Sequence, residues 1–433
     1  MPSEKLYYSL ENANVHTGLL KKMKPSKIVL VAFMVWMVLF FTAPLKVNIE
    51  LNIAAYILMG LGISAFLLGS YLPSKSFSTI SLTENRLKSV MKVIIVVAAV
   101  GVVLKLTDRF LIRGISIGGG NMMNRELMSS GSGNIIGVVG ATLAPFAYIP
   151  LFLLWKYKIK LWFFLKLIVY ALFLMQIFDA LLLGSRSAIF VNFTMLLLYL
   201  LYFRKVVLRW YTYILMGIAL FMFAVVMNYM FVQRTKEFFG DKVYELVLNE
   251  SGFNYTCTAT DEFKKEFRNY SSVGKSVAFT YIVTTQYFTH GVLEFSHLYS
   301  EYSHPYKYGV VTFDLYARML DKVSPVQLSA GDPEDFMPRN GVYTTMIGPF
   351  FIDFGWLLIP FMFLFGRVVK MVYRTAIKQV DWAVILYFYL SLVLVFWPVF
   401  NFINGAGGLY TITGIIVFGL MSRYIYAQSN FVP

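Results

Sequence analysis

One arginine, Arg186, stands in a short turn between two long apolar runs, with Gly184 and Ser185 before it and Ser187 after it. A charge at the edge of an apolar segment is costly unless an anion meets it, so such a residue is a candidate for function. Arginine stays charged and binds phosphate oxygens through paired hydrogen bonds. We therefore predict that Arg186 binds an anion, with Ser185 as a neighbouring contact.

Further arginines and two acids could complete this site. An arginine cluster at membrane level suits a lipid-linked phosphate or diphosphate, and contact with lipid head groups is the ordinary alternative. Asp179 precedes Arg186 by two helical turns and is predicted to pair with it or with another arginine. Asp353 is predicted to contact substrate or to form a structural ion pair. The other arginines predicted to bind the anion are Arg109, Arg113, Arg125, Arg234, Arg318 and Arg339.

A histidine repeat supplies the candidates for a general base. His290, His297 and His304 recur every seven residues, and Glu294 and Glu301 lie three or four residues from them. If residues 289–303 are helical, these side chains share one polar face, where a histidine with a carboxylate partner can accept a proton from a hydroxyl. A solvated helix face without chemistry is the alternative. The spacing differs from that of helical zinc-binding histidines, so no metal is predicted.

The sequence contains none of the common motifs for nucleotide-driven or serine-nucleophile chemistry. It has no phosphate-binding loop of the P-loop type, no paired-aspartate metal motif and no serine elbow, and Gly118–Gly120 has no strand–helix unit around it. Cys257 is the only cysteine, so an internal disulfide is excluded. We expect an activity that needs neither a metal nor another cofactor.

The composition indicates that these residues are held by an all-α protein with several membrane spans. Hydrophobic residues make up 58% of the 433 residues and charged residues only 14%. About ten segments have the length and apolarity of spanning helices. They are predicted at Lys27–Ala43, Leu51–Leu72, Ser89–Leu106, Asn134–Leu154, Leu161–Leu183, Arg186–Phe203, Trp210–Val232, Tyr343–Gly366, Trp382–Phe400 and Gly407–Tyr426.

The distribution of charge predicts the orientation in the membrane. The formal net charge is +15, and the surplus of lysine and arginine falls in alternate connections, while the other connections carry slightly more acid than base. The positive-inside rule then places both termini in the cytoplasm and Arg186 on the external side. The high pI is explained by topology, so no nucleic acid is expected as a partner. The apolar but polar-studded segment Ser276–Val292 is predicted to lie on the surface or to re-enter from outside.

This orientation divides the chain into five regions. The long loop is rich in charge and aromatic residues, which predicts a folded external cap and not a linker. The regions are a cytoplasmic segment (1–26), seven spans (27–232) with a glycine-rich external loop (105–133), the large external loop (233–342) with surface or re-entrant helices, three further spans (343–426) and a cytoplasmic tail (427–433).

Three features together resemble the bacterial O-antigen and capsule repeat-unit polymerases of the Wzy type. They are the Gly184-Ser185-Arg186-Ser187 turn, the large external loop before the third-last span, and the stretch Tyr343–Gly355, which contains Gly-Pro-Phe-Phe and ends in Asp-Phe-Gly. The resemblance implies a glycosyltransferase C-like membrane fold at the outer face of the bacterial inner membrane. It also implies transfer of a growing glycan from undecaprenyl diphosphate to an incoming lipid-linked repeat unit.

The resemblance further implies that external arginines are the functional residues and that no metal is used. It points to Arg186 and to Arg109, which is followed eleven positions later by Gly120, whereas the spacing from Arg339 to Gly348 departs from this pattern. The expected partners are the lipid bilayer, the lipid-linked oligosaccharide, a chain-length regulator and a flippase. Arg186 with Arg109 or Arg234 is predicted to hold the donor diphosphate, and His290, Glu294, His297 or His304 to act at the acceptor hydroxyl.

Two other functions remain open from the sequence. A ligase that transfers the lipid-linked glycan to lipid A core would share the donor and the arginines, and would differ only in its acceptor. A flippase for the lipid-linked unit belongs to a different class, and would place charged or broken helices near the middle of the bilayer. The concentration of ionisable residues at the external ends favours chemistry at the surface over transport. An inert scaffold would leave Arg186 and Asp179 without a role.

Overall fold

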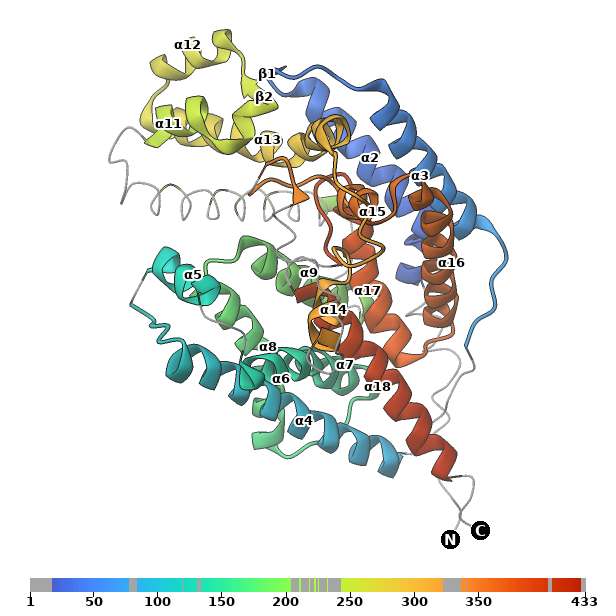
Figure 1. Cartoon of the computed structure of the whole chain (residues 1–433). Coiled ribbons are helices and arrows are strands. Elements are labelled where there is room, and N and C mark those ends of the chain that lie inside the picture. Colours follow the sequence, from blue (N-terminus) through green and yellow to red (C-terminus); the bar gives the residue numbers. More distant parts are fainter. Residues whose placement is uncertain are drawn as a thin grey trace.

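The protein is predominantly helical in the parts that its computed structural model describes (Figure 1). Those parts are residues 18–77, 84–118, 120–130, 134–203, 243–321, 336–339, 341–403 and 407–429, with isolated positions between 210 and 232. The predicted span Trp210–Val232 lies almost wholly outside them, and so does Arg234. Within the described residues, the regular strands are one antiparallel pair of three residues each. An all-α membrane protein is therefore supported at this level.

Six helical segments of the described chain are long and apolar enough to cross a membrane, and they coincide with six of the ten predicted spans. The six are α2 (Pro25–Thr42), α3 (Ile53–Tyr71), α4 (Glu84–Thr107) with the turn after it, α6 with α7 (Ile135–Tyr157), α8 (Phe163–Leu182) and α15 with α16 (Ile347–Ile377). Two predicted spans correspond to shorter apolar helices, α9 (Arg186–Tyr202) and α17 (Asp381–Val395). A third is the helix α18 (Gly408–Ser429), which does not belong to the six.

Two of the six segments are interrupted helices. A 3-10 turn over Ala144–Ala147 separates α6 (Ile135–Leu143) from α7 (Tyr148–Tyr157), and Pro145 in that turn lacks the N–H that a continuous helix requires. In the other segment, α15 (Ile347–Phe354) ends at Gly355, whose φ of 53° breaks the helix before α16 (Leu358–Ile377). The predicted span Tyr343–Gly366 therefore contains a break at Gly355, and the helical segment continues beyond Gly366 to Ile377.

The large loop folds into a cap over one end of the spans, formed by residues 243–301. It contains α11 (Val243–Glu250), β2 (Cys257–Ala259), α12 (Asp261–Asn269) and the long helix α13 (Ser272–Glu301), and it has a small apolar core of its own. The segment Ser276–Val292 is an uninterrupted part of α13, which does not belong to the six apolar helices. Much of α13 is buried against the spans and the cap, so it is not a helix lying free on the surface.

The first external loop fastens the cap to the spans. Strand β1 (Leu45–Val47) follows α2 directly and pairs with β2 of the cap in antiparallel register. The backbone N–H of Asn52 donates to Ser296 Oγ of α13 at 2.9 Å, and Tyr281 Oη donates to the Thr42 carbonyl at 3.2 Å. Two regions far apart in the sequence, both predicted to be external, are thus joined at one end of the molecule.

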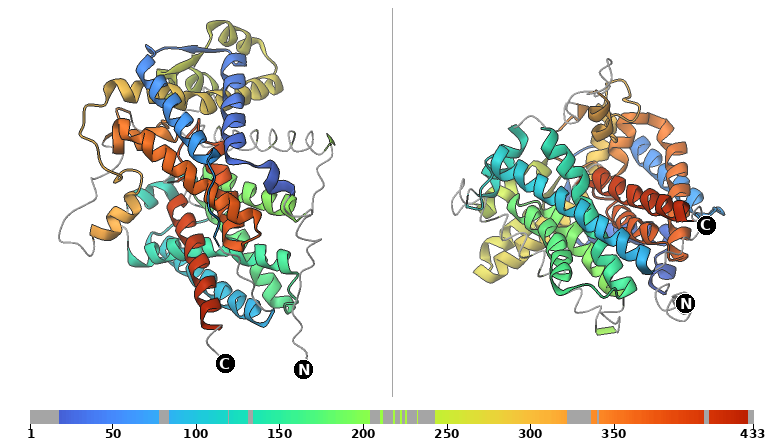
Figure 2. Two further views of the ribbon diagram at one scale, coloured as in Figure 1. Left: turned by 90° about the vertical axis from the view of Figure 1, so that its right-hand side faces the viewer. Right: turned by 90° about the horizontal axis from the view of Figure 1, so that it is seen from below.

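The connections predicted to be cytoplasmic meet at the opposite end. Lys156 in the last turn of α7 forms an ion pair with Asp381 at the start of α17. Arg374 of α16 donates to the Ser74 carbonyl at 2.8 Å, and the Arg423 guanidinium lies 4.8 Å from the Phe77 ring centroid. Figure 2 shows the cap, in yellow, at the end opposite to the last turns of α18, in red. The contacts therefore agree with the predicted grouping of the loops.

Glycines bring α3 and α16 into close contact at the centre of this arrangement. A Cβ added to Gly69 of α3 would overlap the Phe363 carbonyl of α16, and one added to Gly366 of α16 would overlap the Phe66 carbonyl of α3. Between helices in lipid, where no hydrophobic effect drives association, close backbone approach through small residues supplies the packing energy. These two positions therefore fix the separation of the helices.

We expect Gly69→Ala to destabilise the protein, because its methyl group must push α16 away, at about 1–3 kcal/mol for an overpacked site. Gly60→Ala is the matched control in the same helix, since nothing lies within 4 Å of a Cβ at that position. Thermal unfolding in detergent measures both variants. Equal melting temperatures for the two would contradict the close approach of α3 and α16.

Candidate functional site

Cavity A is a hollow of about 430 Å³ among the ends of the spans, lined by parts of α4, α6, α8, α9 and α18. Its wall includes three cations, Lys105, Arg109 and Arg113, and two carboxylates, Asp108 and Asp179. The cations come from the last turn of α4 and from the residues after it, whereas Asp179 comes from α8. This is the main concentration of charge inside the described part of the helical body.

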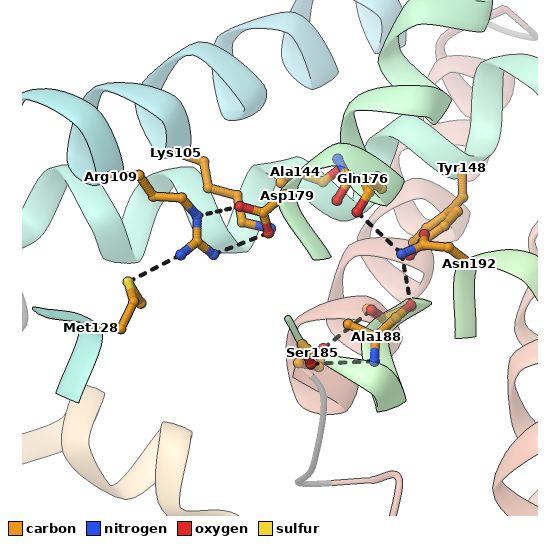
Figure 3. Close-up of polar contacts among 12 residues, drawn as sticks. Lys105, Arg109, Met128, Ala144, Tyr148, Gln176, Asp179, Ser185, Ala188 and Asn192 are labelled. Atoms are coloured by element: carbon orange, nitrogen blue, oxygen red, sulfur yellow. Dashed lines mark hydrogen bonds and ion pairs between the residues drawn. The ribbon is translucent and has the colours of Figure 1, made fainter. Parts of the chain in front are cut away.

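The buried carboxylate of Asp179 is held between Lys105, in the last turn of α4, and Arg109, two residues after α4 ends (Figure 3). Lys105 Nζ lies 2.9 Å from Asp179 Oδ2, and Arg109 Nη2 donates to the same oxygen at 3.0 Å while its Nε contacts Oδ1. Lys105 and Arg109 are four residues apart, so they project from one face of the helix. Arg109 and Asp179 are only 6% and 8% exposed, which makes this a buried ion pair.

A π-helical turn, η1 (Asp108–Ile112), builds the second half of the charged wall. Such turns add one residue to the helix and so change the direction of side chains, and they are frequent at functional sites. Here Arg113 Nε lies 3.1 Å from Asp108 Oδ2, and Arg113 Nη1 donates to the Met128 carbonyl of α5 (Asn121–Ser130) at 2.7 Å. Asn134 also donates to Asp108. Each carboxylate is therefore paired with at least one cation.

The floor of cavity A is an uncharged polar network. Tyr148 Oη donates to Asn192 Oδ1 at 2.7 Å, and Asn192 Nδ2 donates to the carbonyls of Ala188 at 2.8 Å and Gln176 at 3.3 Å (Figure 3). With three cations and two carboxylates, the lining has one surplus positive charge. A buried surplus charge is stable only when an anion or solvent compensates it, so this cavity suits an anionic ligand.

The turn around Arg186 has the predicted form, but Arg186 does not line cavity A. Gly184 takes a left-handed φ of 57°, and Ser185 caps α9, its Oγ lying 3.4 Å from the Ala188 nitrogen. Ser185 lines the cavity, whereas the Arg186 guanidinium lies 5.8 Å from the ring centroid of Tyr287 on α13. The expected cluster of Arg186 with Arg109 in one pocket is therefore not observed.

The predicted geometry of Asp179 is also corrected. The prediction that it shares a helix face with Arg186 is wrong, because α8 ends at Leu182 and the turn interrupts the helical periodicity. Asp179 pairs instead with Lys105 of α4 and with Arg109 just after α4. Pairing with another arginine is the second of the two outcomes predicted for it.

The remaining predicted anion ligands are dispersed. Arg125 is exposed on α5, and Arg318 is exposed on α14 (Asp314–Asp321), where its Nε contacts Asp314 at 2.8 Å. Arg339 reaches Glu294 of α13 at 2.5 Å and stacks 4.2 Å from the Tyr255 ring centroid, so it joins parts of the cap. Of the predicted arginines that the structure describes, only Arg109 and Arg113 line cavity A.

Asp353 has a structural role. It is fully buried, and its two oxygens accept the backbone N–H groups of Val311 at 2.9 Å and Thr312 at 2.7 Å. The carboxylate therefore holds the loop before α14 against α15. A carboxylate engaged in this way is not available to a substrate.

The histidine repeat does not form the predicted polar face, because about half of that face is buried inside the protein. Helix α13 ends at Glu301, so His304 lies beyond it and is exposed, whereas His290 is fully buried. Glu294 is buried too, accepting from Thr256 at 3.0 Å and from Arg339. His297 packs against Tyr255 at a centroid distance of 4.9 Å. None of His290, Glu294, His297 and His304 lines cavity A.

Burial shifts the protonation of the cap residues in opposite directions. It lowers the pKa of His290 to about 4, so this imidazole is neutral at pH 7, and its Nδ1 lies 3.1 Å from the Gln286 carbonyl. Burial raises the pKa of Glu294 against the opposing effect of Arg339. A neutral histidine can accept a proton through its other nitrogen, but His290 Nε2 is enclosed by the cap and has no hydrogen-bond partner among the described residues.

Sequence reasoning missed three groups of cavity A: Lys105, Asp108 and Asn134. Lys105 and Asp108 are three residues apart, and Asp108 directly precedes Arg109. All three lie at the end of an apolar run. That spacing places charges on neighbouring positions of one helix end, and it could have indicated a charged wall. The contribution of Asn134 depends on the approach of α6 to α4, which the sequence alone does not show.

Comparisons with known proteins give no match: no family model, curated protein or solved structure matches the chain.

We expect Asp179→Asn to destabilise the protein by about 3–5 kcal/mol, the usual cost of leaving buried charges without their partner. The matched control is Glu245→Gln, which removes an exposed ion pair to Arg268 at 4.0 Å and is expected to cost less than about 1 kcal/mol. Thermal unfolding in detergent compares them. A loss in Asp179→Asn no larger than in Glu245→Gln would contradict a buried ion pair.

We expect His290 to make stability depend on acid pH. Its pKa is about 4 in the folded protein and near its ordinary 6.5 when unfolded, so the unfolded chain binds more protons between these values. Its contribution is complete above pH 6.5 and is lost as the pH falls towards 4. The melting temperature of His290→Gln should therefore fall less steeply over this window. Parallel profiles would show that His290 is not buried and neutral.

Proposed function

We propose that the protein is a membrane glycosyltransferase that joins lipid-linked oligosaccharide repeat units, with a polyprenyl diphosphate, undecaprenyl diphosphate, bound in cavity A. The observation that carries the proposal is the surplus of fixed cations in a buried cavity at the end of the spans. A diphosphate is an anion that matches such a lining, and its lipid tail would extend into the bilayer beside the apolar spans.

The proposed reaction needs stabilisation of a leaving group more than any other assistance. An acceptor hydroxyl forms a bond from its oxygen to the anomeric carbon of the donor glycan. The bond from that carbon to the diphosphate oxygen breaks, the electron pair leaves with the diphosphate, and the hydroxyl proton passes to a base. Lys105, Arg109 and Arg113 would stabilise the charge that develops on the diphosphate. Asp108 and Asp179 would hold these cations in position before the substrate enters.

Fixed guanidinium groups can perform this task without a metal ion, so the proposed activity is metal-independent. The cap would lie over the outer face of a bacterial inner membrane, as the charge distribution predicts. Its helix α13 contacts the turn beside cavity A, where the Arg186 guanidinium lies 5.8 Å from the Tyr287 ring centroid. The cap would therefore be placed to guide the hydrophilic glycan while the lipid stays in the bilayer. A chain-length regulator and a flippase would act beside such a polymerase.

The decisive experiment uses the purified full-length protein with extracted undecaprenyl-diphosphate-linked repeat units and no nucleotide. A polymerase produces a ladder of glycans that differ by one repeat unit. Transfer that appears only after lipid A core is added would identify a ligase instead. Movement of the lipid-linked unit across a vesicle membrane with no new glycosidic bond would identify a flippase.

We expect Arg109→Lys to lower the rate of chain extension by about 100-fold or more, the usual effect of removing one donor from a charge-stabilising site. Lysine keeps the charge that Asp179 requires but lacks the paired donors of arginine. Arg268→Ala is the control, since this exposed cap arginine lies outside cavity A. Ladder analysis by gel electrophoresis measures the rate. Full activity in Arg109→Lys, with Arg268→Ala also unchanged, would contradict the proposal that the diphosphate binds in cavity A.

A further inference from the structure

A second hollow, cavity B, adjoins cavity A. It has a volume of about 500 Å³ and lies between α14, the segment 342–345, the residues after α17 and the start of α18. Gly407 and Tyr410 line both cavities, so the two spaces are neighbours separated by these residues. Tyr316 of α14 is hydrogen-bonded to Thr413 of α18, which joins the two helices that border cavity B.

Asn401, in the wall of cavity B, has a buried donor that is not used within the described part of the chain. The residue is 4% exposed and lines the cavity, and its Oδ1 accepts the Ile403 N–H at 2.8 Å. Its Nδ2 has no hydrogen-bond partner among the described residues. A buried amide donor without a partner is costly, and native proteins retain such groups where a ligand or water completes the bond.

The backbone beside Asn401 is held in an unusual conformation. Thr345 has a φ of 62°, a left-handed value that is rare for a β-branched residue. Two contacts to the residues after α17 hold the chain in this conformation. Thr345 forms a β-bridge with Phe400, and the Met346 N–H donates to the Trp397 carbonyl at 3.0 Å. Strained residues of this kind concentrate at ligand-binding sites, where the surrounding structure maintains them.

The lining of cavity B differs from that of cavity A in charge and in shape. Its one acid and one base, Asp314 and Arg318, pair with each other, so the lining is electrically neutral. Aromatic walls come from Tyr343, Phe400 and Tyr410. Flat apolar faces combined with amide and hydroxyl groups fit a neutral ring that carries many hydroxyls, and the lining has no surplus charge that would favour an anion.

We propose that cavity B binds the sugar ring attached directly to the diphosphate held in cavity A. This inference rests on the proposed function and names the subsite for the glycan. Asn401 Nδ2 would donate to a ring hydroxyl, and Tyr410, which borders both cavities, would separate the sugar from the phosphates. The cost of an unpaired Asn401 would make the site favour a carrier that bears sugar over the bare carrier.

The test compares two probes on the full-length protein in detergent: undecaprenyl diphosphate without sugar, and the lipid-linked repeat unit extracted from the source cells. We expect the wild-type protein to bind the sugar-bearing probe at least tenfold more tightly. Asn401→Asp keeps the oxygen that Ile403 needs and removes the donor, and Tyr343→Ala removes an aromatic wall that belongs to cavity B and not to cavity A. Both should reduce the preference to near unity with an unchanged Kd for the bare carrier.

Asn269→Ala and Tyr71→Ala are the controls, since both residues are exposed and line neither cavity. Each variant is first shown to melt like the wild type, and Tyr343→Phe, which keeps the ring, should retain most of the preference. An unchanged preference in Asn401→Asp and Tyr343→Ala, or equal weakening of both probes, would overturn the sugar subsite. The proposed function fails separately, if Arg109→Lys leaves the Kd of both probes unchanged or if no ladder forms.

Discussion

The pairing of Asp179 with Lys105 and Arg109 is the constraint on which the charged end of the spans depends. None of the three charges could be buried alone among apolar helices. The free energy needed to remove each charge from water exceeds the interaction free energy that neutral neighbours supply. Their mutual pairing ties the end of α4 and the turn after it to α8. The π-helical turn and the residue after it present Asp108 and Arg113 to the same space.

The two cavities divide the recognition of a composite ligand by its chemistry. Cavity A has surplus cations on an uncharged polar floor, whereas cavity B is neutral and walled by aromatic rings. An anionic group and a polyhydroxylated ring that are covalently joined need such different surroundings within a few bonds of each other. Tyr410 and Gly407 belong to both linings, and the start of α18 therefore sets the boundary between them.

The cap contributes rigidity at the same end of the molecule. The pairing of β1 with β2, the contact of Asn52 with Ser296 and the ion pair of Arg339 with Glu294 join the cap to the spans and to itself. His290 and Glu294, which the sequence indicated as candidates for a general base, are instead part of the interior of the cap. Polar residues at helical spacing are equally compatible with a solvated face and with a buried, paired one, and only the surrounding elements distinguish the two.

The class of fold, most helix positions, the turn at Gly184-Ser185 and the grouping of loops at two ends can be predicted from the amino-acid sequence. These depend on local properties: apolar length, the need for backbone hydrogen bonds in lipid, and the distribution of lysine and arginine. The pairing of Asp179 with Arg109 and not with Arg186, and the position of Asn401 and Thr345 at one cavity, become visible only in the folded protein. Those outcomes depend on how helices distant in the sequence approach each other, and helices that are apolar on nearly every face carry little local signal of which neighbour they will contact.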